Sequence, residues 1–437
     1  MKVIKVSPST LLILVYGFFI LIGSILLKLP WSVHTPIRWI DALFTSASAV
    51  TVTGLAVIDT GTVFTKFGQL VITMLIQVGG LGVMTFAILL YMILGKKIGL
   101  KERLIMQQAL NQVNLGGLIR LVRQLFIFSI SIEIVFMLVL SLQWVPDLGW
   151  KNGLFYSFFH SVSAFNNAGF SLWPDNLSRY VDSPVINIGI TTLIILGGIG
   201  FTVIIEVWQK RKWSKLSLHS KMMLSATLCV NVISAFLVLM LEYHNNQTLG
   251  ELPIVDKIWA SYFQAVSTRT AGFNTIDMAG IDQSTAFLMI ILMFIGAGSG
   301  STGGGIKLTT FLILLLTVSA FIRGQQTIHI FKRSIPESNV WKVLAISMTS
   351  MFVISVGVLL LNITEKLPFL PLFFETVSAF GTVGLSMGIT ASFTIAGKLI
   401  IIFIMITGKV GPLSLVYILA RKESCKYKYP SENIFTG

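Results

Sequence analysis

The sequence predicts an all-α polytopic membrane protein in which four membrane-helix/pore-loop/membrane-helix repeats, with eight spans and four re-entrant half-helices, surround one pore. The chain of 437 residues is 54% hydrophobic and only 11% charged, whereas soluble domains carry about 25% charged residues. Apolar stretches of roughly 20 residues, long enough to cross a bilayer, recur from end to end. In addition, one loop pattern occurs four times along the chain.

The repeated loop begins with Phe, carries Ser four residues later and reaches Gly at its end. The loops read FTSASAVTVTGL, FHSVSAFNNAGF, FQAVSTRTAGF and FETVSAFGTVGL, with the glycines Gly54, Gly169, Gly272 and Gly384 separated by 115, 103 and 112 residues. The Ser-to-Gly interval is six residues in three loops and five in the third, so the third loop departs by one position. The predicted repeats are 1–98, 99–213, 214–334 and 335–437, the last with a basic tail.

The eight predicted spans form four pairs. They are 9–29 and 66–94, 119–143 and 184–209, 220–243 and 285–322, and 338–363 and 394–420. Within each pair, the stretch of about 10 to 13 residues before the Gly is too short to cross a bilayer and predicts a half-helix. Non-helical backbone at membrane depth must be buried in protein or line a water-filled cavity. The four loops therefore predict a shared axial cavity.

The basic residues predict the orientation. Lys and Arg cluster in alternate connections, namely Lys2/Lys5, Lys96 to Arg123, Lys210 to Lys221, Arg323 to Arg333 with Lys342, and Arg421 to Lys428. These clusters hold 21 of the 32 basic residues, against 8 in the opposite connections and 3 within the membrane. This bias predicts two cytoplasmic termini and a multi-pass protein of a cell membrane. It also explains the net charge of +14 without a nucleic-acid partner.

A ring of backbone carbonyls is the predicted ion-binding site. Its residues are Val52, Thr53, Gly54, Asn167, Ala168, Gly169, Thr270, Ala271, Gly272, Thr382, Val383 and Gly384. Glycine permits positive φ, which turns successive carbonyls toward one axis, where they replace the hydration shell of a monovalent cation. No carboxylate stands beside these glycines, as a divalent-selective ring requires. Arg269 lies three residues before Gly272, and we expect it to point behind the loop and bond carbonyls or a carboxylate.

The sixth predicted span is interrupted by GAGSGSTGGGIK at 296–307. Its G-x-G-x-x-G lies between apolar spans and not in a βαβ unit, which argues against a dinucleotide site. We expect no organic cofactor in this chain. Such backbone must lie in the cavity under the filter, where it is a candidate gate. The predicted gating residues are Gly296, Ala297, Gly298, Ser299, Gly300, Ser301, Thr302, Gly303, Gly304, Gly305 and Lys307, with Lys409 of the last span as a second cation near the loop.

The remaining polar residues give weaker indications. Cys229 and Cys425 predict neither a disulfide nor a metal site, and the five histidines are scattered, which disfavours a membrane enzyme. Glu133 and Glu206 belong either to a proton path or to structural hydrogen bonds. Asp41 and Glu375 stand on predicted half-helices, where we expect extracellular or supporting roles.

The repeated loops, together with STRTAGF from Ser267, STGGGIK from Ser301 and GKVGPLSL from Gly408, resemble the Ktr/Trk/HKT superfamily over nearly the whole chain. Eight spans without an extra amino-terminal pair look like the bacterial Ktr membrane subunit. The resemblance implies potassium uptake, a homodimer with one pore per protomer, and a cytosolic ring of nucleotide-binding RCK/KTN subunits. It also implies that the glycines form the filter and that the loop at 296–307 is the gate.

Two positions bear on what the resemblance implies. Gly54 stands where plant relatives that select sodium carry Ser, which favours potassium. Lys409 stands where the family usually carries Arg, and Lys keeps the charge but loses the planar fork. A sodium-permeable transporter of the same fold remains the main alternative, and a membrane enzyme or scaffold a remote one. The sequence leaves open whether transport is passive or coupled to H⁺, and whether Na⁺ acts as an activator or co-ion.

Overall fold

A computed structural model gives the structure of the chain and describes residues 8–82, 118–325, 327–411 and 432. Within these ranges the fold is helical, which confirms the predicted fold class. Several predicted features lie outside the described residues. They are the far ends of the spans 66–94 and 394–420, and the basic residues Lys2, Lys5, Lys96 to Arg103 and Arg421 to Lys428.

The described helices follow the predicted repeats. The first repeat contains α1 (Pro8–Lys28), α2 (Trp39–Thr51), α3 (Thr60–Val63) and α4 (Lys66–Gly80), and the second contains α7 (Leu118–Leu148), α8 (Trp150–Phe165), α9 (Pro184–Ile199) and α10 (Phe201–Lys210). The third contains α11 (Leu218–Glu242), α12 (Ile254–Ser267), α13 (Gln283–Phe294) and α14 (Leu308–Ile322), and the fourth contains α15 (Glu337–Thr364), α16 (Phe369–Gly381) and α17 (Ile395–Val410). A small hairpin of β1 (His329–Ile330) and β2 (Arg333–Ser334) joins α14 to α15.

Each repeat opens with a long apolar helix, followed by a short one. The opening helices α1, α7, α11 and α15 are each long and apolar enough to cross a membrane. The short helices α2, α8, α12 and α16 have 13, 16, 14 and 13 residues. Two of them are thus longer than the 10 to 13 residues expected, but each still ends just before a predicted filter loop.

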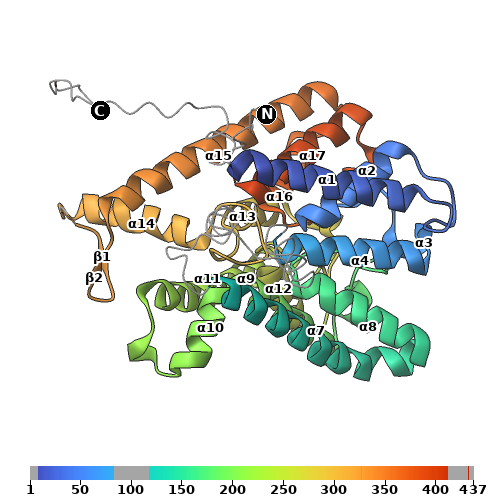
Figure 1. Cartoon of the computed structure of the whole chain (residues 1–437), viewed down its shortest axis with the longest axis horizontal. Helices are drawn as coiled ribbons and strands as arrows, with labels where there is room; N and C mark the ends of the chain where they lie inside the picture. Colours follow the sequence, from blue (N-terminus) through green and yellow to red (C-terminus); the bar gives the residue numbers. More distant parts are fainter. Residues whose placement is uncertain (1–7, 83–117, 326, 412–431, 433–437) are drawn as a thin grey trace, which may run out of the picture.

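The repeats close into a ring through contacts between neighbours. In each repeat, the helix that begins the second predicted span packs against the half-helix of another repeat: α4 against α8, α9 against α12, α13 against α16, and α17 against α2. In Figure 1 the repeats follow one another by colour around the middle of the molecule, and the orange-red fourth repeat lies beside the blue first one. The half-helices are thereby held by two repeats each.

The predicted continuous span 184–209 is wrong, because it is broken at Gly200. The axes of α9 and α10 differ by 95°. Gly200 has φ 104°, which a helix does not allow, and the freed N–H of Phe201 donates to the Gly300 carbonyl at 3.1 Å. The loop at 296–307 therefore replaces a helical hydrogen bond of a different repeat. The second break, between α13 and α14, lies where the sequence predicts it.

A buried ion pair joins the fourth repeat to the first. Lys398 Nζ of α17 lies 2.7 Å from Asp41 Oδ1 of α2, and both side chains are about 90% buried. Asp41 therefore has the supporting role that the sequence left open. Removing one partner of a buried pair leaves the other charge without compensation and costs about 3–5 kcal/mol.

We expect Lys398→Met to lower the thermal stability of the purified protein by several degrees because Asp41 is left buried and unpaired. The double variant Asp41→Leu/Lys398→Met removes both charges and should recover most of that loss. Thermal unfolding in detergent measures both. A double variant no more stable than the single one would contradict this account of the pair.

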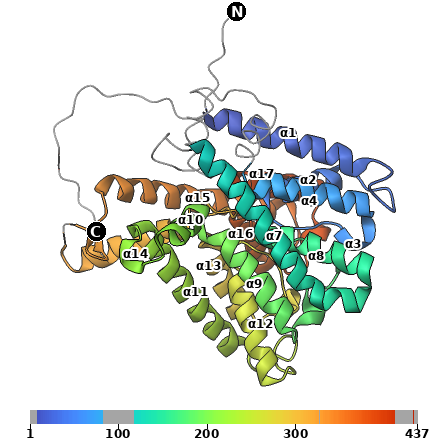
Figure 2. The ribbon, with the colours of Figure 1, turned by 60° about the horizontal axis from the view of Figure 1, so that its bottom comes forward.

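The basic connection before α11 and the basic hairpin after α14 lie at the same end of the molecule. Trp213, in the turn between α10 and α11, contacts Phe331 of the hairpin with ring centroids 6.5 Å apart. Both segments carry Lys and Arg. Figures 1 and 2 show α14 at this edge, away from the middle of the ring.

Candidate functional site

The predicted filter glycines lie next to one another in a closed ring. A Cβ added to Gly54 would lie 3.0 Å from Gly169 Cα, one on Gly169 would lie 3.1 Å from Gly272 Cα, one on Gly272 would lie 3.1 Å from Gly384 Cα, and one on Gly384 would lie 3.0 Å from Gly54 Cα. Each Cβ would also press on the carbonyl oxygen that precedes the neighbouring glycine, namely that of Ala168, Ala271, Val383 or Thr53. Four segments more than 100 residues apart thus meet at one level, without room for a side chain.

The four loops share one backbone conformation. The glycines have φ between 69° and 92°. Two residues before each glycine, Val52, Asn167, Thr270 and Thr382 also have positive φ, between 49° and 78°. Positive φ is unfavourable for β-branched residues and persists where surrounding structure imposes it. The third loop adopts this conformation despite its shorter Ser-to-Gly interval.

The serine of each repeated motif fixes its loop. In the first and fourth repeats, Ser48 Oγ and Ser378 Oγ accept hydrogen bonds from Gly54 N and Gly384 N, both at 3.0 Å. In the second repeat, Ser163 Oγ donates to the Phe170 carbonyl at 2.8 Å, and in the third Ser267 Oγ donates to the Phe273 carbonyl. The sequence singled out these serines without giving their role, which is to tie the filter backbone to the half-helix.

The half-helices favour a cation electrostatically. α2, α8, α12 and α16 all end immediately before the ring of loops. The carboxyl end of a helix carries a partial negative charge from its unpaired carbonyls. Four such ends around one ring create a region that attracts a cation and repels an anion.

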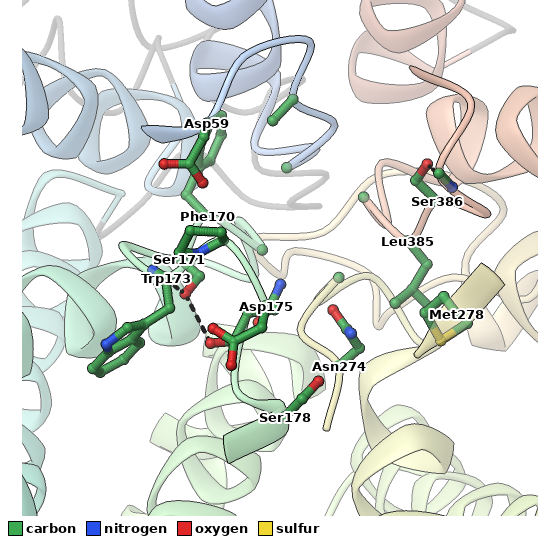
Figure 3. A pocket seen from close by; sticks show the side chains of 18 of the residues that line it. Asp59, Phe170, Ser171, Trp173, Asp175, Ser178, Asn274, Met278, Leu385 and Ser386 are labelled. Atoms are coloured by element: carbon green, nitrogen blue, oxygen red, sulfur yellow. Dashed lines mark hydrogen bonds between the residues drawn. The ribbon is translucent and has the colours of Figure 1, made fainter. Parts of the chain in front are cut away.

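The ring opens into a vestibule of about 550 Å³ lined by all four glycines. Figure 3 shows side chains from every repeat around this space, among them Asp59, Asp175, Asn274 and Ser386. A third carboxylate, Asp277, also lines it. Asp59, Asp175 and Asp277 follow their filter glycines by five or six residues. The sequence analysis missed these residues, although their regular spacing was a usable signal.

The candidate gating loop lies against the other side of the filter. Gly304 N donates to Thr382 Oγ1 at 2.8 Å. A Cβ added to Gly303 would lie 2.9 Å from Thr270 Cβ, and one added to Gly304 would lie 2.6 Å from Thr382 Cγ2. Glycine is therefore required here for the loop to approach two filter residues.

Two repeats hold the loop in place. On the side of the second repeat, Gly298 N donates to the Gly198 carbonyl at 2.8 Å and Thr302 N to the Gly197 carbonyl at 3.3 Å. On the side of the fourth repeat, Gly305 N donates to the Gly408 carbonyl at 3.2 Å. The loop thus extends under the filter from the α9–α10 break to the end of α17.

Two lysines bond the loop carbonyls. Lys409 Nζ donates to the Thr302 carbonyl, and Lys307 Nζ donates to the Gly303 carbonyl. Both lysines therefore contact the loop near which the sequence analysis expected them. The gating role of Lys307 and Lys409 stays a prediction.

Arg269 points away from the filter, into the helices behind it. Its Nη1 donates to Asn231 Oδ1 of α11 at 3.0 Å, so its partner is a side-chain amide. Among the described residues, no carboxylate forms an ion pair with it. The charge of Arg269 is therefore kept off the axis of the ring.

The acidic residues considered from the sequence make structural hydrogen bonds. Glu133 accepts from Gln77 Nε2 at 3.0 Å, Ser129 Oγ at 2.9 Å and Asn166 Nδ2 at 3.3 Å, which joins α4, α7 and the second filter loop. Glu206 accepts from Ser217 N at 2.9 Å and closes the α10–α11 turn.

Glu375 of α16 is buried behind the fourth filter loop. It accepts hydrogen bonds from Ser386 Oγ and from Thr390 Oγ1, the latter at 3.0 Å. Ser386 lines the vestibule, so Glu375 supports the vestibule wall from behind, a role that agrees with the supporting one expected.

Comparisons with known proteins place the chain among cation transporters. The family model TrkH, described as a cation transport protein, matches residues 9–430. The chain is 56% identical to the Ktr system potassium uptake protein B of Bacillus subtilis (strain 168), covering 100% of this chain and 98% of the relative. It is 42% identical to the protein of the same name from Vibrio alginolyticus, covering 99% of this chain and 95% of the relative.

Two further comparisons extend this set. The chain is 37% identical to the potassium/sodium uptake protein NtpJ of Enterococcus hirae, covering 99% of this chain and 98% of the relative. Its fold is similar to the crystal structure of the potassium transporter TrkH from Vibrio parahaemolyticus, with a TM-score of 0.76 and 21% identity over 96% of this chain and 86% of the other. At that identity the structural likeness bears on the fold alone.

Proposed function

The chain belongs to the TrkH family of cation transport proteins, and we propose that it is the potassium-selective, pore-forming subunit of a bacterial potassium uptake system. The family is one of transporters, so the chain is not an enzyme. The proposed path runs from the vestibule through the ring of Gly54, Gly169, Gly272 and Gly384. It then passes the loop at 296–307.

The observation that carries the proposal is the closed contact of the four filter glycines. Each repeat supplies one loop, and the carbonyl before its glycine lies against the glycine of the preceding repeat around the ring. Backbone carbonyls in such a ring suit a weakly hydrated monovalent cation. The ligands proposed for K⁺ are therefore the carbonyls of the filter residues named from the sequence.

Potassium is favoured over sodium by two considerations. Relatives at 56% and 42% identity are named potassium uptake proteins, and all four filter positions hold glycine. The potassium/sodium relative at 37% identity supports the second candidate, in which Na⁺ is also carried or acts as an activator. We also propose that the four repeats meet at residues 98, 213 and 334.

The same relatives support a multi-component system, because their names refer to a Ktr system. We therefore propose a homodimer with one pore per protomer in the bacterial cell membrane. A cytosolic RCK/KTN ring docks on the basic end near Trp213 and Phe331. The vestibule, with Asp59, Asp175 and Asp277, then faces outward and attracts cations. Both termini lie on the cytoplasmic side.

Ion flux into proteoliposomes that contain the full chain tests the proposal. With K⁺ and Na⁺ varied independently under the same membrane potential, we expect K⁺ influx to exceed Na⁺ influx by about tenfold or more, a difference of about 1.4 kcal/mol. Equal fluxes would favour the sodium-permeable alternative. Flux of neither ion, in correctly assembled protein with and without the cytosolic partner, would contradict the assignment as a pore.

A further inference from the structure

We propose that Thr382 couples the filter to the gate: its hydroxyl holds the loop at 296–307 in the closed position, and release of the loop changes the fourth filter segment. This inference rests on the proposed function and adds a regulatory role for one filter residue. Gly304 N donates to Thr382 Oγ1 at 2.8 Å, and both groups are buried. Thr382 stands two residues before Gly384, so one residue touches both the loop and the ring.

The loop has separate anchors on the surrounding helices, and the hydrogen bond from Gly304 N to Thr382 Oγ1 ties it to the filter segment. At the end of α17, Lys409 Nζ donates to the Thr302 carbonyl of the loop, and Gly305 N of the loop donates to the Gly408 carbonyl. Gly298 N ties it to α9. Movement of the loop toward an open position must therefore break the bond to Thr382, in addition to those with the surrounding helices.

The first repeat shows what the filter requires at this position. Val52 occupies the position equivalent to Thr382, with φ 58° against 49°. The backbone hydrogen bonds also correspond: Val52 N donates to Ala49 O and Thr382 N to Ala379 O, at 3.1 and 3.2 Å. The hydroxyl is therefore not needed for the filter conformation. A role beyond that conformation accounts for the hydroxyl at Thr382.

Coupling of this kind is reciprocal. If a closed loop favours one arrangement of the fourth filter segment, then ion occupancy of that segment changes the stability of the closed loop by the same factor. One hydrogen bond of this type corresponds to about a fivefold shift in a two-state equilibrium. Thr382 thus gives the filter a direct influence on the gate, and the gate a direct influence on ion discrimination.

The test compares full-length wild type, Thr382→Val, Thr382→Ser and the matched control Thr376→Val in proteoliposomes. Thr376 lies on the same half-helix, and its hydroxyl donates to the Leu372 carbonyl of its own helix. We expect Thr382→Val to raise basal K⁺ flux about fivefold. Thr382→Ser, which keeps the acceptor, should raise basal K⁺ flux less than Thr382→Val does. The Thr376→Val control should leave the flux unchanged.

A double-mutant cycle separates coupling from a plain filter role. Thr382→Val is combined with deletion of Ala297 to Gly304, which removes its partner Gly304. We expect the substitution to have no further effect on K⁺ flux or on the K⁺/Na⁺ flux ratio in that background. An equal effect in both backgrounds would overturn the proposal.

Two further outcomes bear on the same assay. If the deletion does not assemble, the single substitutions still decide, because Thr382→Val behaving like Thr376→Val would overturn the coupling. If wild type conducts K⁺ selectively, such a result removes the inference alone. If wild type carries no K⁺, the proposed function itself fails.

Discussion

Replacing Gly54 by Ser should reduce the K⁺/Na⁺ flux ratio by about tenfold, equivalent to about 1.4 kcal/mol of discrimination. Gly54 has φ 91°, a conformation that L side chains rarely adopt, and a Cβ there would press on the Ala168 carbonyl and lie 3.0 Å from Gly169 Cα. Either the Ala168 carbonyl or the first loop must shift. Because both belong to the proposed ring, we expect the substitution to reduce the K⁺/Na⁺ flux ratio more than it reduces the stability of the fold.

Gly17→Ser is the matched control for this substitution. Gly17 lies in α1, and nothing stands within 4 Å of the position a Cβ would take. We expect the control to keep the wild-type flux ratio. Thermal unfolding in detergent reports whether each variant is folded. A well-folded Gly54→Ser protein with an unchanged K⁺/Na⁺ ratio would remove Gly54 from the filter.

Deleting Ala297 to Gly304 should raise K⁺ flux by more than about tenfold and make it less dependent on a cytosolic partner. The deletion removes the loop's bonds to Gly197, Gly198 and Thr382, each worth about 1 kcal/mol. The flanking segments already lie together, because Ile295 pairs with Ile306 and Gly296 N donates to the Ile306 carbonyl at 2.8 Å. The two ends that the deletion would join therefore lie close together.

A loop that serves only to pack helices predicts a different result. In that case the deletion would lower the yield of folded protein and the flux together. The measurement is K⁺ flux per assembled protein, with and without partner. A properly assembled deletion variant no more active than wild type would contradict the gate assignment.

Lys409→Ala should also raise K⁺ flux, but by less than the deletion of Ala297 to Gly304 does. It removes the hydrogen bond to the Thr302 carbonyl, while Thr382, Gly197, Gly198 and Gly408 still hold the loop. Lys carries its charge as a single point and lacks the planar fork of Arg, and the structure accordingly gives it one carbonyl partner.

The sequence was sufficient to predict the repeat architecture, because each repeat carries its own signal. Four copies of a Phe, Ser and Gly pattern between apolar stretches indicated half-helices and loops. In the structure, Gly54, Gly169, Gly272 and Gly384 contact one another in a ring, as four loops around one axis would. The roles of these residues in selecting K⁺ remain predictions until they are measured.

Other features depend on contacts between repeats, which the sequence does not show. The break at Gly200 was missed because 184–209 is mostly apolar and long enough for one span. The hydrogen bond that compensates the break is accepted by Gly300, one hundred residues later. The Asp41–Lys398 pair joins residues 357 positions apart. Such pairings follow from ring closure, so they emerge only once the repeats are placed around one axis.

The most direct test of the central claim is to locate a heavy K⁺ analogue in the protein. A structure determined with Rb⁺ or Tl⁺ should show the ion on the axis of the ring, among the carbonyls of Thr53, Ala168, Ala271 and Val383 that adjoin the filter glycines. An ion found only in the vestibule near Asp59, Asp175 and Asp277, with none inside the ring, would contradict the account.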